Sequence, residues 1–285
     1  MIKKFLILFL LLNISFCFAY PKQHSIPPFL IAKNLYYVGT DDLASYLITT
    51  PKGYILINSN LEEDIPLLKA SIKKLGFQWE DIKILLTSHA HLDHAGGSHL
   101  IQQETQASYR VMAQDISVIE TGGRSDFYYA QDSSMYFTPT VVDKVLHDGD
   151  TVSLGDTVLT AHLTAGHTKG CTTWTMPMKE DPKTKIVILC SLHVNSGYPL
   201  IHNGSYPFIA TDYEKSFQYL KSLKGPILFL GAHTEIFNLS KKYSLLNTQK
   251  KNPFIDTQGY KQYINEQEKE FYKELNHQKK EPVSS

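Results

Sequence analysis

The chain has 285 residues, with 28 basic and 28 acidic side chains, 42% apolar residues and 12% aromatic residues. This composition is typical of a folded globular protein and disfavours a disordered chain or a repeat array. The formal net charge of zero disfavours a protein that grips the phosphate backbone of nucleic acid. Three cysteines are too few for a fold built on several disulfides, whereas 12 histidines raise the question of whether they cluster.

The first 19 residues predict a secretory signal peptide. Lys3 and Lys4 precede an apolar run over residues 5–18, which is shorter than the roughly 20 residues that a membrane-spanning helix needs. Cleavage before Tyr20 would leave 285 − 19 = 266 residues. A membrane anchor is the alternative reading of this segment. We expect a periplasmic protein with no stable membrane anchor.

Residues 20–285 are expected to form one domain, because no Gly/Ser-rich linker or internal repeat divides them. In chain order, β-branched and aromatic runs predict strands first, and Pro51-Lys52-Gly53 joins two of them as a hairpin turn. An amphipathic helix ending at Gly76 follows, and then an apolar run suited to a strand buried on both faces. These first elements are strands 35–38, 44–49, 54–58, 82–87 and 109–112 and helices 62–75 and 96–105.

The second half of the chain resembles the first. Its strands begin on either side of the turn Asp148-Gly149-Asp150, and its helices come later. The elements expected are strands 141–146, 151–154, 157–163, 172–178, 186–189 and 227–230 and helices 213–223 and 258–278. Two halves that each run from strands to helices predict an α/β fold, a four-layer αββα sandwich.

Four side chains of the types that bind metals occur within six residues, directly after the strand expected at 82–87. They are His89, His91, Asp93 and His94. If the chain stays extended, His89, His91 and Asp93 project to one side, and Ala95-Gly96-Gly97 then lets a helix begin behind them. Imidazole and carboxylate together favour zinc over magnesium or calcium. The alternative is a polar surface loop rich in histidine.

Two further histidines disfavour that alternative. His167 follows the strand expected at 157–163 and lies between glycines, and His233 follows the strand expected at 227–230. Each histidine alone would be an ordinary loop residue. Together with the four-ligand loop they supply the roughly six protein ligands that two zinc ions need, so the sequence predicts a site for two zinc ions.

These motifs resemble those of a known family. The segments Ser88–His94, Gly166–Thr168 and Gly231–His233 resemble the metallo-β-lactamase superfamily, and the resemblance runs over essentially the whole chain after the signal peptide. The runs 41–47, 166–174 and 195–198 further resemble zinc β-lactamases of subclass B3. The resemblance implies the αββα fold, two zinc ions and hydrolysis of β-lactam antibiotics.

The resemblance also assigns ligands. It implies one zinc on His89, His91 and His167 and a second on Asp93, His94 and His233. Most other hydrolases of the superfamily place a bridging aspartate in the segment that here reads Leu189–His193, and this chain has none. Other β-lactamase subclasses place a cysteine ligand there and subclass B3 a serine. Ser191 fits best, but Cys190 is one residue away, and a shift of one residue in a strand exchanges the two faces.

The ligand set implies a mechanism. Zinc lowers the pKa of a bound water to about 7, so we expect attack by a zinc-bound hydroxide that Asp93 helps to orient. By resemblance, Tyr198 is a candidate oxyanion donor, and Ser191, Asn195 and His193 are candidate contacts of the substrate. Tyr198 could instead be a turn residue, and His193 a solvated loop histidine. The run Phe127-Tyr128-Tyr129 could form a wall over the site or simply pack within its loop.

We therefore predict a periplasmic β-lactamase that binds two zinc ions and confers antibiotic resistance. Its partner is a small β-lactam substrate, and a monomer is the default expectation. A zinc hydrolase of another ester or amide, such as a lactone or thioester, is disfavoured by the missing bridging aspartate. A non-catalytic exported zinc-binding protein is disfavoured by the six retained ligands. Many subclass B3 enzymes carry a disulfide between the strand before the last zinc histidine and the C-terminal helix. Gly225 and Tyr260 occupy the corresponding places here, so that cross-link is expected to be missing.

Overall fold

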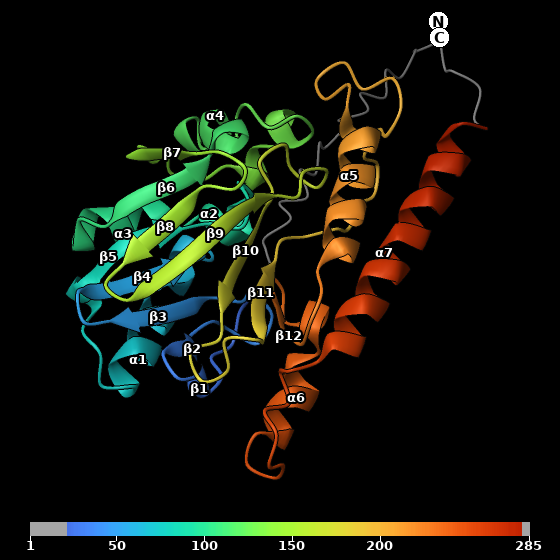
Figure 1. The fold of residues 1–285 in the computed structure, drawn as a ribbon. Helices are drawn as coiled ribbons and strands as arrows, with labels where there is room; N and C mark the ends of the chain where they lie inside the picture. Colours follow the sequence, from blue (N-terminus) through green and yellow to red (C-terminus); the bar gives the residue numbers. More distant parts are fainter. Residues whose placement is uncertain (1–21, 281–285) are drawn as a thin grey trace, which may run out of the picture.

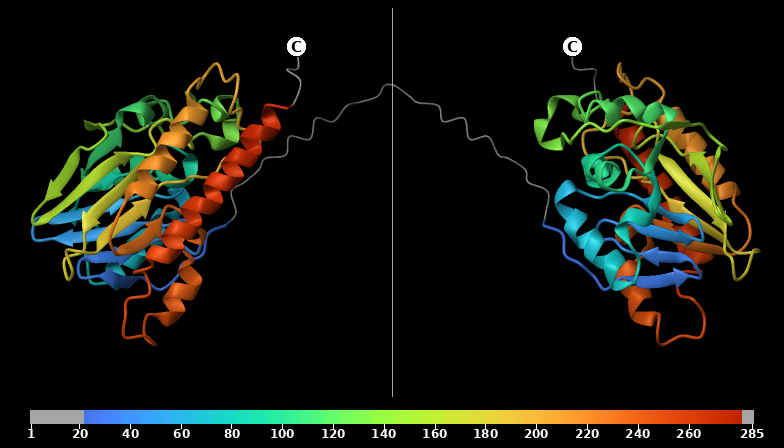
Figure 2. Two further views of the ribbon diagram at one scale, coloured as in Figure 1. Left: turned by 45° about the vertical axis from the view of Figure 1, so that its right-hand side comes forward. Right: turned by 90° about the vertical axis from the view of Figure 1, so that its left-hand side faces the viewer.

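The computed structural model describes residues 22–280, so the signal peptide predicted at 1–19 lies outside the described residues. Two β-sheets face each other, and helices cover both outer surfaces (Figures 1 and 2). The αββα sandwich expected from the sequence is confirmed. None of the helices in residues 22–280 is both long and apolar enough to cross a membrane.

The first sheet has seven strands in chain order, β1-β2-β3-β4-β5-β6-β7. Strands β1 to β4 pair in antiparallel fashion, and β4 to β7 pair in parallel. Thr50 pairs with Gly53, so the predicted hairpin turn is confirmed. The strands are β1 (Phe29–Ala32), β2 (Leu35–Tyr37), β3 (Tyr46–Thr50), β4 (Gly53–Ile57), β5 (Ile82–Leu86), β6 (Ser108–Met112) and β7 (Lys144–Leu146).

The second sheet has five strands in the order β12-β11-β10-β9-β8. Only the pair β11–β12 is parallel. The strands are β8 (Thr151–Leu154), β9 (Thr157–Leu163), β10 (Thr172–Pro177), β11 (Lys185–Leu189) and β12 (Ile227–Gly231).

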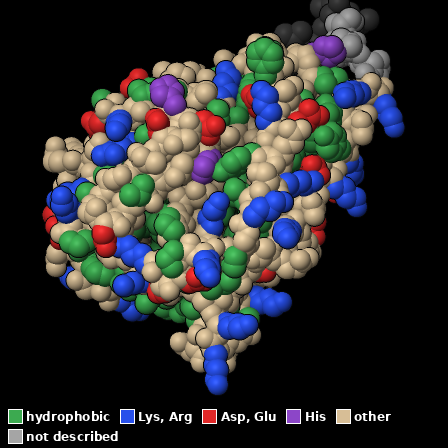
Figure 3. Space-filling view, in the orientation of Figure 1, with side chains coloured by type: hydrophobic (Ala, Val, Ile, Leu, Met, Phe, Trp, Pro, Cys, Tyr) green, Lys and Arg blue, Asp and Glu red, His purple; other side chains and the backbone are tan. Residues whose placement is uncertain are grey.

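Helices pack on the outer face of each sheet (Figure 2). The α-helices are α1 (Ile65–Lys74), α2 (Leu92–Ala95), α3 (Ser98–Thr105), α4 (Ile116–Glu120), α5 (Ile209–Ser222), α6 (Leu239–Leu245) and α7 (Thr257–Gln278). Helices α1 and α3 cover the first sheet, and α5 and α7 cover the second (Figure 1). The face that includes α5 and α7 carries interspersed basic, acidic and hydrophobic side chains (Figure 3).

Strand β5 illustrates how the sequence builds the layers. Ile84 and Leu86 belong to the apolar core between the sheets, whereas Leu85 belongs to the core under α1 and α3. Successive side chains of a strand point to opposite faces, so an unbroken apolar run fits a strand covered on both sides. The expectation of a doubly buried strand here is confirmed, with Lys83 the exposed exception. The chain then leaves β5 at the edge of the sandwich where the metal-type side chains begin.

The buried carboxyl group of Asp64 predicts a pH-dependent gain in stability on mutation. Asp64 is 3% exposed at the start of α1, and burial raises its pKa from 3.8 to about 6. The folded chain therefore holds this proton more tightly than the unfolded chain, and its stabilising effect, complete below about pH 4, is lost as the pH rises through 6. We expect Asp64→Asn to stabilise the metal-free protein by about 1 to 2 kcal/mol at pH 7.5, a figure discounted for solvent screening.

Urea denaturation in the presence of a chelator measures this effect. The gain should shrink towards zero at pH 4.5. An equal gain at both pH values would contradict the assignment to the carboxyl proton.

Candidate metal centre

The six predicted ligands come together at one edge of the sandwich. His89 and His91 lie in the loop after β5, and Asp93 and His94 lie on α2. The other two follow strands of the second sheet, His167 after β9 and His233 after β12. Five of the six side chains are buried, and His233 is partly buried. Strand ends from both sheets thus position side chains that are up to 144 residues apart in the chain (233 − 89 = 144).

The first group of donors consists of three histidines. The ring centroids of His89, His91 and His167 lie 4.7 to 4.8 Å from one another. The possible ligand atoms of the three rings all lie within 4.8 Å of each other. The buried Nε2 of His89 has no hydrogen-bond partner among residues 22–280. A buried polar atom without a partner is costly, and a metal ion among the three rings would satisfy it.

The second group is more compact. Asp93 Oδ2 lies 3.2 Å from His94 Nε2 and 3.3 Å from His233 Nε2, and the two imidazole nitrogens are 3.0 Å apart. Zinc with ligand bonds of about 2.0 to 2.2 Å in a tetrahedron separates its donors by roughly 3.3 Å. The three atoms therefore fit around one such ion.

Hydrogen bonds orient two of these rings from behind. His167 Nδ1 donates to the carbonyl of His193 at 2.8 Å, and His233 Nδ1 lies 3.3 Å from a carboxylate oxygen of Asp42. Holding Nδ1 in this way leaves Nε2 to face the centre, which is the usual arrangement behind a metal-binding histidine. Asp42 was not singled out from the sequence as a partner of His233, because 191 residues separate the two.

The electrostatics suit a bound cation. Burial, reinforced by the neighbouring rings, holds the pKa of His89 and of His167 well below the usual range, so both are neutral and can accept a metal. Burial alone would raise the pKa of Asp93, but His94 and His233 outweigh it and keep the group ionised. Burial likewise opposes the charged form of His233, but Asp42 and Asp93 together raise its pKa to about 10. The carboxylates of Asp42 and Asp93 therefore favour positive charge at the second group, where a metal ion would replace the proton on His233.

A cavity of about 290 Å³ opens beside the two groups. Three of the predicted substrate contacts, Ser191, His193 and Asn195, line it, as does Tyr129 from the aromatic run. Four further lining residues belong to no motif of the sequence, and they are Met135, Glu235, Ile236 and Tyr263. The cavity therefore brings ligand donors and the predicted contacts to one space.

Tyr198 lies behind this cavity rather than along it. The side chain is fully buried, and its hydroxyl donates to the carbonyl of His167 at 3.2 Å and lies 3.5 Å from His91 Nε2. Phe127 and Tyr128 pack against its ring at 4.9 and 4.8 Å. Of the run Phe127-Tyr128-Tyr129, only Tyr129 lines the cavity.

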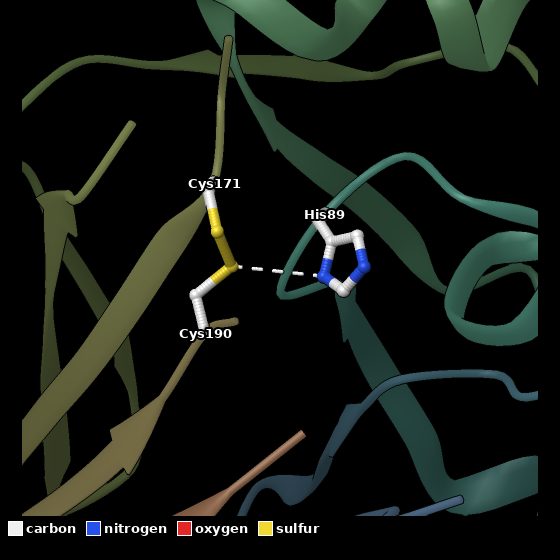
Figure 4. Close-up of side chains that lie close together, drawn as sticks. All are labelled: His89, Cys171 and Cys190. Atoms are coloured by element: carbon white, nitrogen blue, oxygen red, sulfur yellow. Dashed lines mark hydrogen bonds between the residues drawn. A yellow bond between two sulfur atoms is a disulfide. The ribbon is translucent and has the colours of Figure 1, made fainter. Parts of the chain in front are cut away.

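A disulfide joins Cys171 and Cys190, next to the first group (Figure 4). Both cysteines are fully buried, and Cys190 Sγ lies 3.6 Å from His89 Nδ1. The sulfur that the sequence left as a possible ligand is therefore bonded to another sulfur, while Ser191 lines the cavity. This disulfide was not predicted from the sequence, although two cysteines in a chain expected to be exported are a signal for one.

One local expectation is wrong. The chain is extended only as far as His91, with φ −100° and ψ 156°, and Asp93 lies on the helical turn of α2. The backbone nitrogens of His94 and Ala95 both donate to the carbonyl of His91, which starts this turn. The turn allows the adjacent residues Asp93 and His94 to face the same donor group, which an extended chain would not.

Gly166 offers a test of how tightly the His167 loop is held. Its φ is +138°, and a Cβ there would lie 2.6 to 2.8 Å from three ring carbons of Tyr213. We expect Gly166→Ala to destabilise the protein by about 1 to 3 kcal/mol and to lower its zinc content, because the added carbon displaces the adjacent ligand. Gly149→Ala is the control, since Gly149 also has positive φ (+83°) but open space around it. Similar zinc loss in both variants would contradict this expectation.

Comparisons with known proteins agree with this geometry. Residues 39–233 match the family model of the metallo-beta-lactamase superfamily. The structure is similar to that of the FEZ-1 metallo-beta-lactamase from Legionella gormanii, with 58% identity, coverage of 92% of this chain and 100% of that chain, and a TM-score of 0.90. It is also similar to BJP-1, a subclass B3 metallo-beta-lactamase of Bradyrhizobium japonicum, with 35% identity, coverage of 90% and 96%, and a TM-score of 0.83.

A third structure extends the likeness. LRA-12, described as a class B3 di-zinc metallo-beta-lactamase from an Alaskan soil metagenome, has 36% identity, with coverage of 88% of this chain and 94% of that chain and a TM-score of 0.79.

Proposed function

Because this chain belongs to the metallo-β-lactamase superfamily, we propose that it is a zinc-dependent β-lactamase of subclass B3, a hydrolase that opens the amide bond of β-lactam antibiotics. The observation that carries this proposal is the convergence of six metal-type donors, in two groups, on one open cavity. The 58% identity to FEZ-1 over the full length of that chain supports the same activity. Resistance to β-lactam antibiotics follows from the activity.

Two zinc ions are the cofactors. The proposed ligands of the first are His89, His91 and His167, and those of the second are Asp93, His94 and His233. The unpartnered Nε2 of His89 and the 3.0 to 3.3 Å triangle of the second group support this assignment. Zinc, when bound, supplies a Lewis acid for the lactam carbonyl and a nucleophile generated from water near neutral pH.

Side chains of the protein would position the substrate and orient the attacking water. The Asp93 carboxylate, kept ionised by its neighbours, can accept a hydrogen bond from the attacking water and so direct its lone pair. Ser191 and Asn195 offer a hydroxyl and an amide at the cavity wall, where they can bind the polar groups of a β-lactam. An oxyanion contact from Tyr198 requires its hydroxyl to leave the carbonyl of His167 and turn towards the cavity. His193 lines the same cavity and is a further candidate substrate contact.

The proposed cellular location rests on the signal peptide predicted at residues 1–19. We propose a periplasmic protein that acts as a monomer on a small-molecule substrate and has no nucleic-acid partner. The balanced charge of the chain supports the last point.

Hydrolysis of a chromogenic cephalosporin by the purified mature chain tests the proposed function. We expect zinc-dependent ring opening, seen as a colour change. A fully zinc-loaded protein that leaves the cephalosporin intact would overturn the proposal. A lactone and a thioester, assayed in parallel, identify the alternative: a much larger kcat/KM for either one would favour a zinc hydrolase of that ester.

A further inference from the structure

A buried carboxylate joins the two loops that carry the three-histidine group. Asp115 is 1% exposed at the end of the short turn after β6, and none of the motifs in the sequence includes it. One of its oxygens, Oδ2, accepts from the backbone nitrogen of Ala90 at 3.0 Å and from the hydroxyl of Thr168 at 2.9 Å. The other, Oδ1, accepts from the backbone nitrogen of Gly170 at 2.7 Å.

The residues that Asp115 holds are neighbours of the ligands. Ala90 lies between His89 and His91, and Thr168 follows His167 directly. The carboxylate therefore connects the backbone of two ligands in one loop to that of the third ligand in another loop. The second donor group has a different support, because His233 is held by Asp42 and by its own loop.

The fit around Asp115 is tight. A Cβ on Gly170 would lie 2.6 to 2.7 Å from Asp115 Cγ, Cβ and N, so only glycine allows the loop to approach this closely. All three hydrogen bonds run from donors to the carboxylate. A side chain with fewer acceptor positions leaves at least one buried backbone N–H without a partner, which destabilises the arrangement of the two loops.

The buried negative charge of Asp115 also favours a cation close to it. Among the described residues, no Lys or Arg forms an ion pair with it. A buried carboxylate without a cationic partner is costly. The histidines that flank its hydrogen-bond donors would hold a dication close by, and that charge would offset part of the cost.

We propose that Asp115 is a positioning residue for the first zinc ion, which sets the distance between the His89–His91 loop and the His167 loop. This inference rests on the proposed function, since it concerns the same metal centre. It assigns a role to a residue that contacts neither the metal donors nor the cavity.

Asp115→Asn tests the proposal by zinc affinity rather than by activity. The amide keeps the size of the side chain but places an NH₂ group against a backbone donor. We expect zinc affinity at the three-histidine group to fall by about 10-fold or more, within the range seen when the support of a metal ligand is removed. Competition of the metal-free protein with a chromophoric zinc chelator gives the two affinities.

Three variants make the measurement specific. His233→Ala removes a donor of the second group and so identifies which titration step belongs to the first. Asp42→Asn, which acts behind His233, should weaken the other step. Asp143→Asn is a matched control, because its exposed carboxylate also accepts a backbone N–H, but from Tyr109, which lies in neither loop. It should change neither affinity.

Cobalt substitution gives a second measurement. The visible spectrum of the cobalt protein should change in Asp115→Asn and stay unchanged in Asp143→Asn. If Asp115→Asn does not fold, Thr168→Val removes one of the three hydrogen bonds and should weaken the same step less, and Thr168→Ser should restore it. Unchanged affinity, or equal weakening of both steps, would overturn the proposal. A wild-type protein that binds no zinc would instead overturn the proposed function.

Discussion

Removal of zinc with a strong chelator is expected to abolish hydrolysis of a chromogenic cephalosporin, and readdition of zinc to restore it. The reason is the composition of the site, in which all six convergent donors are imidazole or carboxylate groups suited to zinc. Ser191 lines the cavity, but among residues 22–280 its hydroxyl donates to no base; its oxygen accepts from the backbone nitrogen of His193. The initial rate before and after chelation, together with the zinc content, measures the effect.

Thermal stability provides an independent measurement of the effect of zinc removal. A ligand that binds only the folded chain stabilises it, by about 2.7 kcal/mol for each site when free zinc is 100 times the Kd. The metal-free protein should therefore melt at a lower temperature and recover with zinc. Magnesium, which prefers oxygen ligands, should restore neither activity nor melting temperature. Full activity in protein shown to be free of zinc would contradict the assigned chemistry.

The second large effect is expected from His89→Ala or Asp93→Ala, one ligand from each group. Each change removes one of the three proposed protein donors of a zinc ion, and Asp93→Ala also removes the carboxylate that is proposed to orient the water. We expect kcat/KM to fall by about 1000-fold or more, equivalent to about 4 kcal/mol of transition-state stabilisation. Steady-state assays at saturating zinc measure it, and zinc content separates loss of metal from loss of orientation.

His99→Ala is the matched control for these variants. His99 is exposed on α3, five residues beyond His94 (99 − 94 = 5). The variant therefore removes an imidazole from the same region of the chain without touching a proposed ligand. Its rate and zinc content should equal those of the wild type. A double variant lacking His89 and Asp93 that still turned over substrate with zinc would refute the ligand assignment.

The sequence was most informative where spacing is local. The loop from His89 to His94 reads as a metal site because its donors recur within a few residues after an apolar strand. His167 and His233 could be added because each follows another apolar run. The hairpin at Pro51-Lys52-Gly53 and the long helix α7 are confirmed for the same reason, since turn residues and helical periodicity are contained in short windows.

Features built from long-range contacts could not be read in this way. Asp115 approaches Gly170 across 55 residues, and Asp42 approaches His233 across 191. Nothing in a short window of sequence distinguishes either carboxylate from a solvated one. The short elements β1, α4 and α6 also escaped prediction, because four to seven residues hold at most about two periods of a strand or helix pattern.

The strand expected at 141–146 shows a different kind of limit. Only β7, residues 144–146, pairs with β6. The carboxylate of Asp143 accepts from the backbone nitrogen of Tyr109, the group that a longer strand would have engaged. A side chain thus replaced a ladder hydrogen bond, which propensity alone does not reveal.

The Cys171–Cys190 bridge has a consequence for how the protein is prepared. It closes a loop with a sequence separation of 19, so the oxidised chain is expected to be more stable than the reduced chain by about 3 kcal/mol. In reduced protein, two thiols, which are soft metal ligands, would lie beside His89. Cys190 Sγ lies 3.3 Å from the carbonyl oxygen of Ser88, and Cys171 Sγ lies 3.3 Å from the carbonyl oxygen of Ser191. Material recovered from a reducing cytosol and material secreted into an oxidising compartment would then share every residue and still differ in metal content.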